Sequence, residues 1–346
     1  MTKKQRVLVT GDKGYIGSVL TRNLDRLGYD VVGLDICYYA DNLIAPEFDN
    51  YQSVMKDIRD ITIGDLDGID SIIHLAALSN DPLGEFSPLL TEEINRNASI
   101  NLAMLAKQAG VKRFIYSSSQ SMYGIADDSG ELNEDGPKHP ITAYARTKWE
   151  AEQQLMKLAN DSFIVVAFRP STVFGFSPRL RTDVVFNSLL GCGYTTKRIE
   201  IKSDGTPWRP VIHIEDVCSA YVAGLSAPKE LVQMQAFNVG VRGVNYQVRD
   251  MADCAGELVP NCEVIYTGEH GSDSRTYKVN FDKINDILSE YYQPKWDLTS
   301  GGHAMIECFD KHGFTAEQFN SRVTNRLLQL KYLTSNNYLN NQMEWQ

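Results

Sequence analysis

Short runs of apolar residues alternate with stretches of helical periodicity through the first half of the chain. Six runs predict strands, at 6–10, 30–35, 53–57, 71–77, 113–119 and 163–170. Between them, three stretches predict helices, at 15–28, 91–110 and 143–160. Alternation of this kind is typical of an α/β fold with a doubly wound parallel sheet, the Rossmann type, and nearly continuous apolar strands indicate a sheet covered on both faces.

The pattern becomes less regular after residue 170. Loops rich in Gly, Pro and Arg occupy 174–182 and 203–210, and helices are predicted at 213–225 and 248–258, with a strand at 236–240. We expect residues 1–170 to form the dinucleotide-binding domain, with later segments returning to it. Residues 171–346 would mainly form a smaller α/β substrate-binding lobe over the carboxyl ends of the strands, with a polar C-terminal tail of undetermined structure.

Composition and charge narrow the class of ligand and the compartment. The formal net charge is −10, and a field of this sign repels nucleic acid. The six cysteines form no CxxC pair and no close Cys/His cluster, which predicts free thiols in a reducing compartment and no metal site. No apolar segment approaches the roughly 20 residues of a membrane helix. We therefore expect a cytoplasmic protein with neither membrane nor nucleic-acid partners.

A glycine-rich turn follows the first predicted strand. In "TGDKGYIG", Gly11, Gly14 and Gly17 lie between a strand and a helix, where a tight turn aims backbone N–H groups at a pyrophosphate. Asp35 ends the second strand, where a carboxylate can accept hydrogen bonds from ribose hydroxyls and would repel a 2′-phosphate. This pattern predicts NAD rather than NADP. Asp57 and Ile58 are candidates to flank the adenine, although a plain turn explains them almost equally well.

Tyr144 and Lys148 are four residues apart on the helix predicted at 143–160. This spacing brings both side chains to one helix face, either as a surface pair or as a proton-transfer site, and the spacing alone does not decide between them. A nearby ammonium and a positively charged nicotinamide would both favour tyrosinate and lower the pKa of the tyrosine toward the range of a useful general base.

These motifs together resemble the extended short-chain dehydrogenase/reductase family, and specifically its nucleotide-sugar epimerases and dehydratases. The resemblance rests on "TGDKGYIG", "HLAA" (74–77), "FIYSSSQSMYG" (114–124), the Tyr144/Lys148 pair and "RPVIHIEDV" (209–217). It implies a catalytic Ser119, with Ser121 as the alternative, together with Tyr144 and Lys148. The NAD site that it implies comprises Gly11, Gly14, Tyr15, Ile16, Gly17, Asp35, Asp57, Ile58, Leu75, Ala76, Ala77, Tyr144 and Lys148.

The same resemblance implies a nucleoside-diphosphate sugar as substrate. Arg209 and Arg275 match the family's phosphate-binding arginines, although either could be a surface residue. Asn97 matches an asparagine near the active site, although a buried asparagine that only supports the helix explains it equally well. Two segments depart from the common pattern, with Thr172 in place of an asparagine and "RLRTD" (179–183) in place of an uncharged stretch. The expected substrate-binding residues are Ser119, Ser121, Asn97, Thr172, Arg179, Arg181, Arg209 and Arg275.

The reaction expected from the resemblance is epimerisation by transient oxidation at C4 of the sugar. A 4-dehydrogenase or reductase and a dehydratase of the same family remain open. The 4,6-dehydratases carry an Asp-Glu pair after the catalytic Ser/Thr, where this chain has Gln120 and Ser121. A non-catalytic dinucleotide sensor of this fold is an alternative of another class, although it would be expected to lose Tyr144 or Lys148. The resemblance also implies a homodimer through the helices at 91–110 and 143–160. Leu155 and Met156 are among the candidate contacts, although they could equally be core residues.

Overall fold

The computed structural model describes residues 4–124, 130–269 and 276–346. A sheet of seven strands dominates the first lobe, and every neighbouring pair in it is parallel. In spatial order the strands are β12 (Gln235–Val239), β7 (Ile164–Pro170), β5 (Arg113–Ser117), β4 (Ser71–His74), β1 (Arg6–Thr10), β2 (Asp30–Asp35) and β3 (Gln52–Met55). The doubly wound parallel sheet predicted from the sequence is confirmed.

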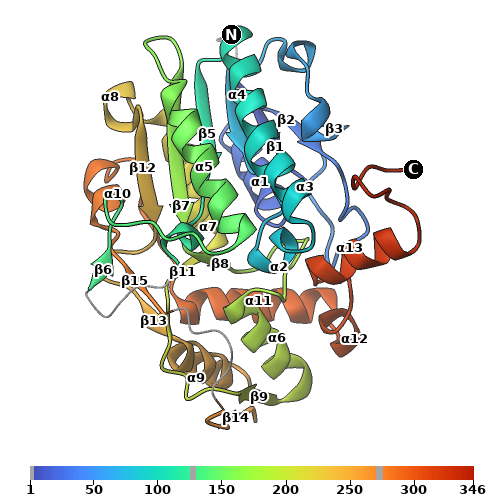
Figure 1. The fold of residues 1–346 in the computed structure, drawn as a ribbon. Helices are drawn as coiled ribbons and strands as arrows, with labels where there is room; N and C mark the ends of the chain where they lie inside the picture. The colour runs from blue at the N-terminus through green and yellow to red at the C-terminus, as the bar shows by residue number, and fades with distance from the viewer. Residues whose placement is uncertain (1–3, 125–129, 270–275) are drawn as a thin grey trace.

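Helices cover both faces of this sheet (Figure 1). One face carries α2 (Asp81–Gly84), α3 (Pro88–Glu92), α4 (Ser99–Gln108) and α5 (Ala143–Lys157). The other face carries α1 (Gly17–Arg26) and α7 (Ile214–Ser226), and α8 (Lys229–Val232) and α10 (Asp282–Ile287) pack near β12. Alternate residues of each central strand point to opposite faces, so Ile72 and Ile73 of β4 belong to different cores.

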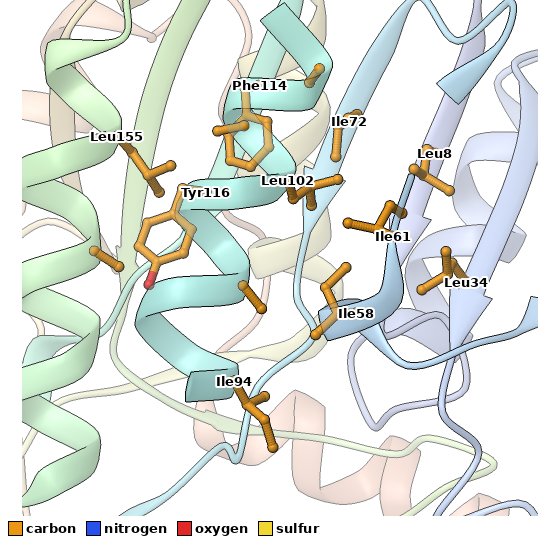
Figure 2. Close-up of a cluster of buried hydrophobic side chains, with 14 of the residues drawn as sticks. Leu8, Leu34, Ile58, Ile61, Ile72, Ile94, Leu102, Phe114, Tyr116 and Leu155 are labelled. Atoms are coloured by element: carbon orange, nitrogen blue, oxygen red, sulfur yellow. The ribbon is translucent and has the colours of Figure 1, made fainter. Parts of the chain in front are cut away.

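The core beneath α4 and α5 is continuous with the C-terminal segment of the chain. Figure 2 shows Leu8, Ile72 and Phe114 of the sheet meeting Leu102 of α4 and Leu155 of α5. Leu330 and Leu333 of α13 (Arg326–Ser335), together with Leu339 and Met343, belong to the same cluster. Leu155 is fully buried there, so of the two roles open to it, dimer contact or core residue, the structure shows the core, and Met156 packs partly buried against the same core.

The second lobe has its own core and lies at the carboxyl end of the sheet (Figure 1). Its main helices are α6 (Val185–Thr196), α9 (Val248–Leu258), α11 (Leu298–His312) and α12 (Ala316–Phe319). Small two-stranded sheets complete this lobe or join it to the first one. They pair β8 (Thr172–Phe174) with β11 (Val211–His213), β9 (Arg198–Ile201) with β14 (Glu263–Tyr266), β10 (Trp208–Arg209) with β13 (Tyr246–Gln247), and β6 (Glu131–Leu132) with β15 (Lys278–Val279).

One predicted helix differs from expectation. The stretch 91–110 is α3, a π-helical turn at Glu93–Ala98 and α4 in succession, so its register shifts by one residue in the middle. This shift affects a predicted site residue. Asn95 is buried and Asn97 is exposed on the outside of the turn.

Candidate active site

A cleft of about 650 Å³ separates the carboxyl ends of the strands from the second lobe. Its lining includes nearly all of the residues predicted for cofactor and substrate, drawn from segments that are more than 100 positions apart. The predicted residues that line it are Gly11, Gly14, Tyr15, Ile16, Gly17, Asp35, Asp57, Ile58, Leu75, Ala76, Ala77, Ser119, Ser121, Tyr144, Lys148, Thr172, Arg181 and Arg209.

The glycine turn is packed too closely for side chains. Gly11 has a φ of +77°, and a Cβ there would lie 2.8 Å from the backbone nitrogen of Ala76. A Cβ on Gly17 would lie 2.1 Å from the Gly11 carbonyl oxygen. The turn therefore brings β1 and the start of α1 against the end of β4. No side chain caps the first turn of α1. An uncapped helix start that opens on a cleft suits a phosphate group.

Asp35 occupies the end of β2 on the cleft wall. Its carboxylate accepts hydrogen bonds from the backbone N–H of Cys37, at 2.7 Å, and of Lys13, at 3.1 Å. Burial raises the pKa of Asp35 to about 6, and the neighbouring Asp12 adds to this rise. Two carboxylate oxygens provide about four acceptor positions, so the two backbone bonds leave capacity for ribose hydroxyls.

Asp12, inside the glycine turn, is a buried residue that the sequence reasoning missed. It accepts hydrogen bonds from the Tyr51 hydroxyl, at 2.9 Å, and from the Ser53 hydroxyl, at 2.7 Å, and it ties the turn to β3. Gly33 makes room for it, because a Cβ there would lie 2.1 Å from an Asp12 carboxylate oxygen. An acidic residue within a glycine turn was the available signal, but nothing in the sequence indicated what it contacts.

Asp57 is held in place by its own neighbour. Its carboxylate accepts bonds from Arg59 Nε and Nη2, at 3.0 and 2.6 Å, and from the Arg59 backbone N–H. Asp57 and Ile58 both line the cleft beside Lys56. The two residues therefore combine a structural turn with a position on the cleft wall.

The start of α5 places Tyr144 in the cleft. Thr142 caps the helix by accepting a bond from the Ala145 N–H, and it donates to Asp81 at the start of α2 at 2.6 Å. Gly84, at the end of α2, packs so tightly that a Cβ there would lie 2.8 Å from the Tyr144 Cβ. Tyr144 is thus positioned by a helix cap on one side and a close backbone contact on the other.

Ser119 lies beside Tyr144 at the end of the segment that follows β5. Its hydroxyl is 2.9 Å from that of Ser121. Burial raises the pKa of Tyr144 to about 12, and a hydrogen bond with Ser119 acts in the lowering direction. The protein's own groups therefore hold the pKa of Tyr144 above its ordinary value, and the lowering expected from an ammonium together with a charged nicotinamide stays a prediction.

Lys148 is almost fully buried one turn after Tyr144. Its Nζ donates to the Ser117 carbonyl oxygen at 2.8 Å and lies 4.9 Å from the centre of the Tyr116 ring. Burial lowers the pKa of Lys148 to about 7. The surface-pair explanation of Tyr144 and Lys148 is wrong, because both side chains line the cleft and the lysine is 3% exposed.

The charged segment 179–183 divides between the cleft and the protein interior. Arg181 lines the cleft, pairs with Asp183 at 2.8 Å and donates to the Ser79 hydroxyl at 3.0 Å. Arg179 turns away, where its guanidinium pairs with Glu47 at 2.9 Å and donates to the carbonyls of Tyr39 and Ala40. Of the two arginines, only Arg181 faces the space where a substrate would lie.

Three other predicted substrate contacts have different outcomes. Thr172 and Arg209 line the cleft, whereas Arg275 lies outside the described residues. Asn97 is exposed and its side chain accepts a bond from Arg96. Asn95 faces inward instead, and its amide exchanges hydrogen bonds of 2.8 and 3.1 Å with the Leu78 backbone, fixing the cleft-lining loop after β4. The π-helical turn, which has no clear sequence signature, is the reason that the asparagines exchange roles.

Within residues 4–124, 130–269 and 276–346, no group of three or more His, Cys, Asp or Glu side chains could hold a metal ion. Over those residues, no helix has the length and apolar character needed to span a bilayer.

Comparison with known proteins identifies the family. The model of the NAD dependent epimerase/dehydratase family matches residues 7–240. The UDP-glucose 4-epimerase of Mycolicibacterium smegmatis is 31% identical over 321 residues, covering 88% of this chain and 98% of that protein. The mouse dTDP-D-glucose 4,6-dehydratase is 26% identical over 332 residues and 89% of each chain. The structure of MoeE5 in complex with UDP-glucose and NAD superimposes with a TM-score of 0.74 at 28% identity, over 88% of this chain and 99% of that one. The chain therefore belongs to the NAD-dependent epimerase/dehydratase family of enzymes.

Proposed function

We propose that this enzyme is a nucleotide-sugar epimerase that acts by transient oxidation at C4 of the sugar, with Tyr144 as the base. The observation that carries the proposal is the convergence of Ser119, Tyr144 and Lys148 in one cleft with the glycine turn and Asp35. A sugar hydroxyl and a dinucleotide bound in that cleft would meet at the three side chains.

The residues present fit NAD. The close-packed turn at Gly11 and Gly17 and the uncapped start of α1 suit its pyrophosphate, and the free acceptor positions of Asp35 suit the adenosine ribose. NAD⁺, when bound, supplies the hydride acceptor and a positive charge for the reaction. Lys148 has three donors, of which Ser117 takes one, so the others suit the second ribose.

Tyr144 and Ser119 would handle the proton and the oxygen. Tyr144 takes the proton from the O4 hydroxyl, and Ser119 donates a hydrogen bond to that oxygen as it becomes a carbonyl. Because burial holds the pKa of Tyr144 near 12, deprotonation requires added positive charge in the cleft, supplied by the protonated Lys148 and the oxidised cofactor. After the keto-sugar has turned over, return of the hydride to the opposite face of C4 and of the proton from Tyr144 to O4 would complete an epimerisation.

The second lobe would bind the nucleoside diphosphate. Thr172 and Arg209 line its side of the cleft, and Arg181 is held toward the sugar end by Asp183 and Ser79. Guanidinium groups suit diphosphate oxygens through charge-assisted bidentate bonds. The relatives named for UDP-glucose and dTDP-glucose support a nucleoside-diphosphate sugar as the substrate class.

The surroundings of Gln120 argue against 4,6-dehydration. In the dehydratases an Asp-Glu pair follows the catalytic Ser/Thr. Here Gln120 is buried and donates to the Arg169 carbonyl at 3.0 Å, and the Ser121 hydroxyl lies by Ser119. Neither side chain can exchange protons as a carboxylate does, so loss of water from C5 and C6 has no acid-base pair at these positions.

We also propose a homodimer that works in the cytoplasm. The six cysteines are free, which agrees with a reducing compartment. Helices α4 and α5 lie side by side on one outer face of the sheet, and α4 presents Met104, which is 55% exposed. Two such helices from each subunit would form a four-helix interface.

The test is incubation of the purified protein with NAD⁺ and UDP-, GDP-, CDP- and dTDP-sugars, followed by mass spectrometry and NMR. An epimerase yields a product of unchanged mass with inverted configuration at C4 and no accumulated NADH. A product lighter by two hydrogens, with stoichiometric NADH, would replace the proposal with a 4-dehydrogenase. A product that has lost water would replace it with a dehydratase.

A further inference from the structure

The C-terminal segment returns to the carboxyl edge of the sheet and holds the loop that follows β2. Gln329 donates to the Tyr38 carbonyl at 2.9 Å, and Trp345 Nε1 donates to the Ile36 carbonyl at 2.7 Å. The Tyr38 hydroxyl donates in turn to the Met343 carbonyl. The loop that begins at Asp35 is therefore shaped by residues about 300 positions later, outside the span that the family model matches.

Arg326, the first residue of α13, lines the cleft although it is only 2% exposed. Its guanidinium lies 4.4 Å from the centre of the Tyr39 ring, and Nη2 donates to the Arg179 carbonyl at 2.7 Å. The buried Nη1 has no hydrogen-bond partner in the part of the chain that the structure describes. One guanidinium nitrogen of this buried arginine thus has no hydrogen-bond partner among the described residues, although the arginine lines the cleft.

Arg326 differs from its two neighbouring arginines in lacking an acid. Arg179 pairs with Glu47 and Arg181 with Asp183, but no carboxylate among residues 4–124, 130–269 and 276–346 forms an ion pair with Arg326. Burial and the charge of Arg181 lower the pKa of Arg326 to about 10. A buried charge without a counter-charge is costly, so an anion arriving in the cleft would stabilise this arrangement.

The position of Arg326 indicates which anion it meets. Tyr39, on which it packs, lines the cleft four residues after Asp35. Arg179, whose carbonyl oxygen it contacts, comes two residues before the cleft-lining Arg181. Arg326 therefore lines the same cleft as Asp35, the glycine turn and Tyr144, and it packs beside the wall suited to the adenosine ribose. The group that joins the two halves of a dinucleotide is its pyrophosphate.

We propose that Arg326 binds the pyrophosphate of NAD, so that α13 completes a cofactor site whose other residues lie in the first half of the chain. The guanidinium Nη1 donates to a phosphate oxygen, opposite the backbone amides of the glycine turn. This role depends on the family's cofactor and not on the proposed epimerisation. Measurements of cofactor binding can therefore test it whether or not the enzyme is an epimerase.

The test measures binding by calorimetry to the wild type and to Arg326→Gln, with three probes. NAD⁺ and ADP-ribose contain the pyrophosphate, and adenosine lacks it. Losing a charge-assisted bond should weaken NAD⁺ and ADP-ribose by about 10- to 100-fold and leave adenosine unchanged. Lys331→Gln removes the same charge from an exposed position of the same helix and should change none of the three affinities by more than about twofold.

Several outcomes would overturn the assignment. Equal weakening of adenosine and ADP-ribose would mean that Arg326 only shapes the protein. In a second outcome, the variant binds NAD⁺ as the wild type does, but the NAD-loaded variant binds UDP-glucuronic acid more weakly than UDP-glucose. This result would assign the arginine to an anion of the substrate. If Arg326→Gln does not fold, as judged by circular dichroism, Arg326→Lys replaces it. In Arg326→Lys, a smaller loss of affinity for both NAD⁺ and ADP-ribose, with adenosine unchanged, would support the proposal, and no loss for any probe would refute it.

Discussion

Burial acts in opposite directions on the two ionisable side chains at the centre of the cleft. It raises the pKa of Tyr144 to about 12 and lowers the pKa of Lys148 to about 7, because both charged forms lose water. Near neutral pH the protein alone thus favours a neutral tyrosine and a partly deprotonated lysine. Under the proposed mechanism, the pair would become reactive only when further positive charge enters the cleft, which would link proton transfer to the presence of the cofactor.

The first prediction tests Tyr144 as the base. Tyr144→Phe removes one hydroxyl, so the fold and NAD⁺ affinity should remain close to those of the wild type. Turnover should fall by about 10²–10⁴-fold, the usual effect of losing a positioned acid-base group. Steady-state kinetics measure this fall, with circular dichroism and calorimetric NAD⁺ binding as controls. Wild-type turnover in this variant would end the proposal that Tyr144 is the base.

Lys148 gives a prediction about pH and stability. Its pKa lies near 7 in the folded protein and near its ordinary 10.5 in the unfolded chain, so between these values the unfolded chain binds more protons. The free energy of unfolding should therefore rise with pH between pH 7 and 9, by at most about 1.4 kcal/mol per unit from this group.

Urea unfolding of the wild type and of Lys148→Met at pH 7, 8 and 9 measures this slope. The variant should lose the Lys148 contribution, so the two stabilities should diverge as the pH rises, with the wild type gaining. Comparing the two proteins removes the effect of other titrating groups. Parallel curves would show that Lys148 titrates alike in the folded and unfolded states.

At the scale of elements, short and irregular helices position the site. The four-residue helix α2 contacts the start of α5 through Gly84, and the π-helical turn at Glu93–Ala98 aims Asn95 at the loop after β4. Neither element is long enough to be stable alone, so each depends on the contacts that it makes. Small changes in these contacts should therefore affect the catalytic geometry more than the stability of the fold.

Gly84→Ala tests this expectation. The added Cβ would lie 2.8 Å from the Tyr144 Cβ, so α5 or α2 must shift. We expect a loss of about 1–3 kcal/mol in the free energy of unfolding and a fall in turnover of about 10- to 100-fold from the displaced tyrosine. Gly64→Ala is the matched control, since its Cβ would meet nothing closer than 3.9 Å. Equal activity of the two variants would show that the α2 contact does not set the position of Tyr144.

The sequence predicted best the elements whose pattern is local. The strands β1, β2, β4, β5 and β7 and the helix α5 follow from apolar runs and helical periodicity within single segments, and the glycine turn follows from its position between them. Asn95 and Arg326 could not be predicted in the same way. The role of Asn95 depends on one extra residue in a helical turn, and that of Arg326 on packing between segments far apart in the chain. Local propensity carries no information about either.

At the scale of the molecule, the face formed by α3 and α4 is the most apolar part of the surface near the proposed dimer contact. Leu89 of α3 is 78% exposed and Met104 of α4 is 55% exposed. Apolar side chains that remain exposed on adjacent helices are typical of surfaces that pair with another chain.

Met104→Glu should therefore shift the protein from dimer to monomer, because a buried unpaired carboxylate would oppose association. Light scattering at micromolar concentration, coupled to size-exclusion chromatography, measures the mass. Leu27→Glu is the control, since Leu27 is 60% exposed at the end of α1, on the other face of the sheet. A wild-type mass that corresponds to a monomer would contradict the dimer itself, and an unchanged dimer mass for Met104→Glu would place the interface elsewhere.

The contacts of α13 and of Trp345 with the loop after β2 also constrain how the protein is made. A ribosome delivers the glycine turn, Asp35 and Tyr38 long before it delivers Gln329 and Trp345, which hold that loop 291 and 309 positions later. During most of synthesis, the hydrophobic core that contains Leu8 and Phe114 lacks the side chains of Leu330 and Leu333, which complete it. A nascent chain in this state is a natural target for chaperones, and dinucleotide captured early would be held only loosely until translation has passed α13.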